Sequence, residues 1–89
     1  METLAPTLRV RLDDVLGDLR HARRTGDLGR LALLTYCEVR RWARAAGEQA
    51  IADQSLAMLT RDPCSTRAEF LDRVDGLIGQ LESARARLN

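Results

Sequence analysis

Residues 66–88, TRAEFLDRVDGLIGQLESARARL, carry the clearest helical pattern in the chain. Their apolar residues recur at steps of four and three, which places them on one face of an α-helix. These residues are Phe70, Val74, Leu77, Leu81, Ala84 and Leu88. Thr66, followed three residues later by Glu69, matches a capping box and marks the start of this helix. The stretch predicts a long amphipathic helix that needs other helices to cover its apolar face.

A second amphipathic pattern lies near the start of the chain and predicts a helix from about Pro6 to Arg24. The residues of its apolar stripe are Leu8, Leu12, Val15, Leu19 and Ala22. Pro6 suits a first helical turn, and Gly26 can adopt the left-handed conformation that ends a helix. Asp27 is then a good N-cap for the next helix.

The helix that follows Asp27 is apolar around most of its first half. Its stripe is formed by Leu28, Ala32, Thr35, Val39, Trp42 and Ala46, and further apolar residues surround it at Leu31, Leu33, Leu34, Tyr36 and Cys37. A helix with so broad an apolar surface is usually central in its domain or shared with a partner.

Gly47 interrupts the pattern of this central helix. We expect a break there and a new helix that starts near Glu48 and ends around Arg61, because Pro63 disfavours helical geometry in the residue before it. The alternative is one long helix over residues 27–61 that bends at Gly47.

Composition and connection lengths define the fold class. The chain has 89 residues, 45% of them hydrophobic and only 3% aromatic, and Leu and Ala dominate the apolar set. This composition favours an all-α fold and a single domain over residues 1–89. Short connections predict a small antiparallel bundle of three to four helices. A single core of this size is marginal, so we expect the bundle to self-associate.

The sequence also gives expectations about location and cofactors. It shows neither the pattern of a secretory signal nor an apolar run long enough to cross a bilayer, so we expect a cytoplasmic protein. Cys37 and Cys64 lack metal-ligand spacing and are expected to be reduced and structural. We predict no metal and no other cofactor.

The leading functional hypothesis is a non-enzymatic protein–protein interaction module of the adaptor or regulatory type. Its expected interface is the central helix, at Leu31, Leu33, Leu34, Tyr36 and Trp42, and its partner a second copy or a helical protein. For Trp42 the alternative is a place in the core of its own chain. An enzyme is not expected, because the chain offers one histidine and no carboxylate pair embedded in apolar sequence.

An uneven distribution of arginine suggests a second hypothesis. Residues 20–47 carry seven arginines against two carboxylates, although the formal net charge of the chain is only +1. Six of these arginines could form a weak site for anions or nucleic acid: Arg20, Arg23, Arg24, Arg40, Arg41 and Arg44. Because the rest of the chain is net acidic, we do not expect nucleic acid to be the partner.

A third hypothesis concerns His21, the only histidine. The run from His21 to Arg30 resembles histidine phosphotransfer domains, helical bundles in which an exposed histidine accepts a phosphoryl group. That resemblance implies phosphotransfer at His21. The sequence departs from the family pattern because Thr25 stands where those domains have a glycine, and Arg24 where they have a lysine.

Overall fold

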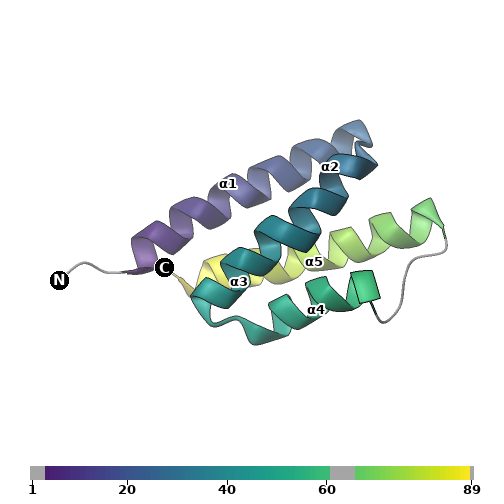
Figure 1. Ribbon diagram of the computed structural model, residues 1–89. Helices are drawn as coiled ribbons and strands as arrows, with labels where there is room; N and C mark the ends of the chain where they lie inside the picture. The colour runs from purple at the N-terminus through teal and green to yellow at the C-terminus, as the bar shows by residue number, and fades with distance from the viewer. Residues whose placement is uncertain (1–3, 61–65, 89) are drawn as a thin grey trace.

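The protein is an all-α bundle in the computed structural model, which describes residues 4–60 and 66–88. Its elements are α1 (Leu4–Thr25), α2 (Leu28–Leu33), the π-helix η1 (Leu34–Val39), α3 (Arg40–Ala46), α4 (Gln49–Thr60) and α5 (Arg67–Arg87). Because α2, η1 and α3 follow one another without a gap, residues 28–46 form one continuous central helix. The described residues contain no strand, and the predicted all-α bundle is confirmed (Figure 1).

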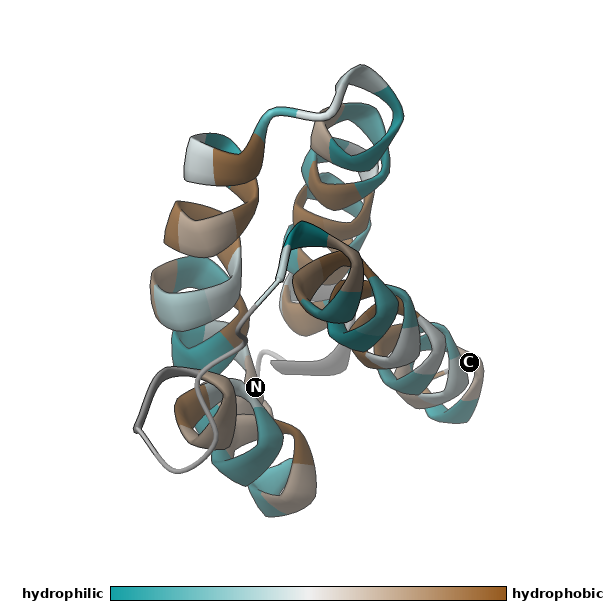
Figure 2. Cartoon of the chain, turned by 90° about the vertical axis from the view of Figure 1, so that its right-hand side faces the viewer, coloured by the Kyte–Doolittle hydropathy of each residue, from teal (hydrophilic) through white to brown (hydrophobic). Residues whose placement is uncertain are grey.

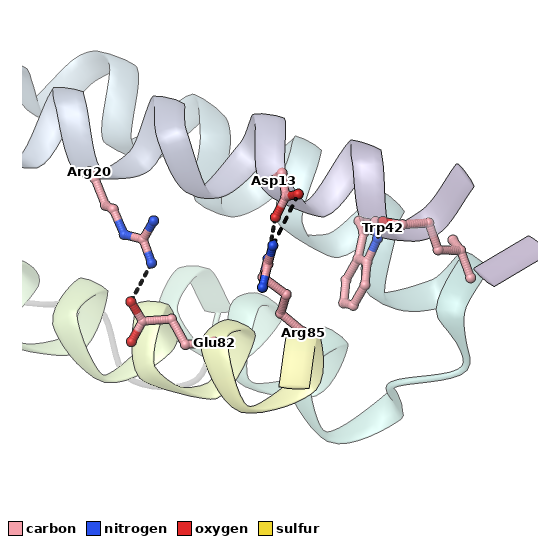
Figure 3. Close-up of polar contacts among 6 residues, drawn as sticks. Asp13, Arg20, Trp42, Glu82 and Arg85 are labelled. Atoms are coloured by element: carbon pink, nitrogen blue, oxygen red, sulfur yellow. Dashed lines mark hydrogen bonds and ion pairs between the residues drawn. The ribbon is translucent and has the colours of Figure 1, made fainter. Parts of the chain in front are cut away.

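The helix α1, the central helix, α4 and α5 run alternately in opposite directions. Figure 1 shows α1 beside the central helix and α5 running along α1, with α4 next to α3 and α5. Ion pairs join α1 to α5: Asp13 pairs with Arg85 and Arg20 with Glu82 (Figure 3), and Arg23 pairs with Asp75. Residue numbers rise along α1 as those of the partners fall along α5, so these two helices are antiparallel.

Two glycines in the left-handed conformation end α1 and the central helix. Gly26 has a φ of 72° and Gly47 a φ of 75°, values that side-chain-bearing residues avoid. The Asp27 carboxylate then accepts a hydrogen bond from the backbone N–H of Arg30 at 3.1 Å and caps α2. The predicted break at Gly47 is confirmed, and the alternative of one bent helix over residues 27–61 is wrong.

Helices α1 and α5 bury the middle of the apolar faces that the spacing predicts, while Leu8, Phe70 and Leu88 at the ends of those faces are half-buried. Figure 2 shows apolar segments of the helices turned toward one another. The buried residues of α1 are Leu12, Val15, Leu16, Leu19 and Ala22, and those of α5 are Val74, Leu77, Leu81 and Ala84. The cap of α5 is confirmed as well, because the Thr66 hydroxyl accepts a hydrogen bond from the N–H of Glu69 at 3.0 Å.

The π-helix accounts for the broad apolar surface of the central helix. Leu31, Thr35, Val39 and Ala43 are all fully buried although they are spaced by four residues each. An α-helix turns once in 3.6 residues, so residues spaced by four are rotated by about 40° from one to the next around the helix axis and leave the buried face. The wider turn of η1, with its i to i+5 hydrogen bonds, corrects this drift. The sequence predicts an ordinary α-helix here, and the π-helix is a finding of the structure.

A buried polar contact joins η1 to α4. Ser55 and Thr35 are both fully buried, and the Ser55 hydroxyl donates a hydrogen bond to the Thr35 carbonyl. Where backbone hydrogen bonding changes between the i+4 pattern of an α-helix and the i+5 pattern of a π-helix, one carbonyl is left without a backbone donor. The Ser55 hydroxyl supplies a donor to a carbonyl of the π-helix. The Thr35 hydroxyl is also buried and has no hydrogen-bond partner among the described residues.

Two further expectations concern membrane spans and the segment around Pro63. No helix in the described part of the chain combines the length and the apolar character needed to cross a membrane. The expected end of the third helix at Arg61, and the expectations for Pro63 and Cys64, fall outside the described residues.

Candidate functional site

Three of the five residues predicted to form an interface lie in the core of the single chain. Leu31, Leu34 and Trp42 have exposed fractions of 0%, 2% and 4%. The indole N–H of Trp42 donates a hydrogen bond to the Leu8 carbonyl of α1 at 2.8 Å, which fixes the ring between the two helices (Figure 3). The prediction is corrected here: these three side chains pack inside their own chain, where α1 and α4 contact the central helix, and they are not exposed interface residues.

Leu33 is the predicted interface residue that remains accessible, with 53% of its surface exposed, while Tyr36 is half-buried. Leu33 lines a groove of 480 Å³ between α1 and the central helix. The α1 side is formed by Leu8, Arg11, Asp14, Val15 and Asp18, and the opposite side by Arg30, Leu33, Leu34, Glu38, Arg41, Trp42 and Ala45. The groove therefore combines buried apolar residues with a charged rim.

The rim of this groove carries both signs of charge in equal number. Three arginines and three carboxylates line it, and Arg30 and Asp18 form an ion pair at 3.7 Å. Within residues 4–60 and 66–88, no ion pair engages the other charged rim residues, which are Arg11, Asp14, Glu38 and Arg41. They stay available to charged groups of a partner. Sequence reasoning missed the α1 side, although Arg11, Asp14 and Asp18 follow a helical spacing beside the buried stripe.

The arginines of the predicted cluster form two separate groups. The first group, on α1, is Arg20, Arg23 and Arg24, and the second group, on α3, is Arg40, Arg41 and Arg44. The second group lies beside Trp42, which forms a hydrogen bond with Leu8 of α1. Arg20 of the first group lies twelve residues further along α1 than Leu8. Twelve residues of α-helix span about 18 Å. The structure therefore does not bring the six arginines together into one site.

The first group serves the bundle itself. Arg23 is bidentate to Asp75 of α5, at 2.9 Å and 3.1 Å, and Arg20 pairs with Glu82. Hydrogen bonding to Asp75 raises the pKa of Arg23. In the same row of contacts, the hydrogen bond from Arg85 lowers the pKa of Asp13 below its ordinary value. These arginines hold α1 against α5, while Arg24 is exposed beside them.

The second group lines a hollow of 350 Å³ on the central helix, formed by Tyr36, Cys37, Arg40, Arg41 and Arg44. Arg41 and Arg44 are exposed and Arg40 is half-buried. In the described part of the chain none of the three arginines forms an ion pair. Arg41 also lines the groove, so the two surfaces adjoin at this residue.

Comparison with known proteins gives no match. No protein-family model matches the chain, and no curated protein or solved structure is significantly similar to it. Functional conclusions therefore depend on the groove, the arginine hollow and the surroundings of His21.

His21 is exposed on α1, as a phosphotransfer site requires. The Thr25 hydroxyl donates hydrogen bonds to the His21 and Ala22 carbonyls, at 3.1 Å and 3.3 Å, so this side chain lies against the turn that follows the histidine. Arg23, the arginine two residues further on, is bound to Asp75. Among the described residues there is also no group of three or more histidine, cysteine or acidic side chains that could hold a metal ion.

Proposed function

We propose that the protein is a non-enzymatic interaction module that associates with a second copy of itself through the groove between α1 and the central helix. The observation that carries this proposal is the position of Leu33, a large apolar side chain that is 53% exposed at the edge of a groove with a buried apolar floor. An apolar side chain in such a place gains free energy when a partner covers it.

The charges of the groove favour a second copy as the occupant. In a two-fold dimer each patch meets the same patch of its partner, so a surface with one sign of charge repels its copy. The groove avoids this repulsion because its rim has three arginines and three carboxylates. Arg11, Asp14, Glu38 and Arg41 have no ion-pair partner within the described part of the chain, and a second copy supplies partners of both signs.

Variants at two exposed apolar positions test this proposal. Leu33→Asp places a charge in the groove, whereas Val10→Asp makes the same kind of change at a residue that is 60% exposed on α1 and does not line the groove. We expect sedimentation equilibrium at micromolar concentration to give twice the chain mass of 9.9 kDa for the wild type and for Val10→Asp. Leu33→Asp should give the mass of one chain.

The result that contradicts the proposal is a wild-type mass of one chain at all concentrations. Equal weakening by both substitutions also contradicts it, because the loss then follows from added charge and not from the groove. Circular dichroism of each variant establishes that the helices are retained.

Phosphotransfer at His21 is the weaker candidate function. The exposed imidazole favours it, but Thr25 and Arg24 occupy the positions at which such domains have a small residue and a lysine. We expect no acid-labile phosphorylation of the protein by acetyl phosphate. A phosphorylated product that is lost in His21→Gln would support the phosphotransfer function instead.

A further inference from the structure

Three arginines give one face of the central helix a single sign of charge. Arg40 and Arg44 lie one helical turn apart, about 6 Å along the helix axis, with Arg41 beside them. All three line the same hollow, together with Tyr36 and Cys37. We call this surface, Tyr36, Cys37, Arg40, Arg41 and Arg44, the arginine face.

The bundle does not neutralise the arginine face. Elsewhere the chain pairs its arginines across helices, as Arg23 with Asp75 and Arg85 with Asp13. The arginines of the face have no such partner among the described residues. Glu48, which follows α3 in the sequence, forms an ion pair with Arg87 at 2.8 Å, and Glu38 lines the groove and not the hollow.

We propose that the arginine face binds an acidic segment of another protein, with its carboxylates on the guanidinium groups of Arg40, Arg41 and Arg44. A guanidinium group binds a carboxylate through two parallel hydrogen bonds, which makes arginine well suited to this recognition. Carboxylates one turn apart on a helix have the same spacing as Arg40 and Arg44. Arg40 and Arg44 do not line the groove, so their contacts with the segment are independent of the proposed function, whereas Arg41 is shared with the groove.

The charge of the face decides between the acidic segment and other occupants. A second copy of the same face would bring three arginines against three arginines, so Arg40 and Arg44, which do not line the groove, take no part in self-association. Duplex nucleic acid presents phosphates over a long path, and its binding proteins are basic over a whole side of the domain. Here one short helix carries the arginines, and the net charge of the chain is +1.

Fluorescence anisotropy with a labelled model peptide tests the inference. The probe is an acidic helical peptide of about 16 residues, long enough to form helix, with glutamates at steps of three and four, and its control has glutamine in place of glutamate. The wild type should bind the acidic peptide, and binding should weaken as salt is raised. In the double variant Arg40→Gln with Arg44→Gln we expect affinity to fall about tenfold.

A matched double variant controls for net charge. Arg24 and Arg67 are both exposed and lie at the other end of the bundle, where Arg67 approaches Gly26. Arg24→Gln with Arg67→Gln removes the same charge, and we expect it to change the affinity less than about twofold. The variant Leu33→Asp should still bind the peptide, because Arg40 and Arg44 do not line the groove and are present in each single chain.

Several results would overturn the inference. These are no binding of the acidic peptide, equal binding of the glutamine peptide, or equal losses in the two double variants. Tighter binding of a DNA duplex, lost in Arg40→Gln with Arg44→Gln, would assign the face to nucleic acid instead. Loss of peptide binding in Leu33→Asp would show that the face requires the dimer.

Discussion

The contact between Ser55 and the Thr35 carbonyl yields a prediction about the stability of the bundle. Both residues are fully buried, and Ser55→Ala removes the hydroxyl that donates to this carbonyl. The substitution loses the net stabilisation of one hydrogen bond, about 1 kcal/mol, and leaves a buried carbonyl short of a donor, which costs a further 1 kcal/mol or so. We expect a loss of about 2 kcal/mol in the free energy of unfolding, or roughly 10 °C in Tm.

Thr35→Val, which keeps the shape of the side chain, should instead increase the free energy of unfolding. The Thr35 hydroxyl is buried without a partner among the described residues, so its removal should stabilise the fold by about 1 kcal/mol. Ser83→Ala is the control, because Ser83 is exposed on α5. Its effect should remain within about 0.5 kcal/mol.

Urea denaturation measures all three variants, with the fluorescence of Trp42, the only tryptophan, as the signal. The protein concentration must be the same in each experiment, because association with a second copy adds to the apparent stability. The reasoning is refuted if Ser55→Ala is as stable as the wild type. It is also refuted if Thr35→Val destabilises the fold, since the hydroxyl then has a partner.

Further predictions concern the helix ends and the ion pairs. Gly47→Ala should destabilise the fold by about 1 kcal/mol, because Gly47 has a positive φ. Gly79→Ala, inside α5 and with open space at the Cβ position, should stabilise the fold by up to about 1 kcal/mol. Thermal unfolding compares the two variants. Thr66→Ala should cost about 1 kcal/mol in the same assay through loss of the α5 cap, without an effect on the mass in solution. Since Arg85 lowers the pKa of Asp13, the pair stabilises the fold above the ordinary pKa of 3.8 and loses its effect as the pH falls through the lowered value. Asp13→Asn should therefore flatten the loss of stability below about pH 4 in acid titrations followed by circular dichroism.

The sequence predicts the helices and their ends well because those features depend on local chemistry. Gly26, Asp27, Gly47 and Thr66 act on backbone groups within a few residues of themselves, and the structure places all four at helix ends. The buried face of α5 likewise follows from spacing alone. Local signals of this kind do not depend on how the helices pack.

The candidate site is less predictable because it depends on packing between distant residues. Leu33 and Leu34 are neighbours of the same type, yet one is 53% exposed and the other 2% exposed. The π-helix that begins at Leu34 changes the phase of the central helix, and no residue pattern signals it. The partners of Arg20 and Arg23 lie on α5, so the sequence alone does not show which arginines are neutralised and which form the arginine face.

The most direct test of the central claim is isotope-filtered NMR on a mixture of labelled and unlabelled protein. The experiment detects only contacts between different copies of the chain. If the groove forms the dimer, the Leu33 methyl groups of one copy give cross-peaks to residues that line the groove of the other, such as Leu8 and Val15. Intermolecular cross-peaks that arise only from other surfaces, or the absence of any, would contradict self-association through the groove.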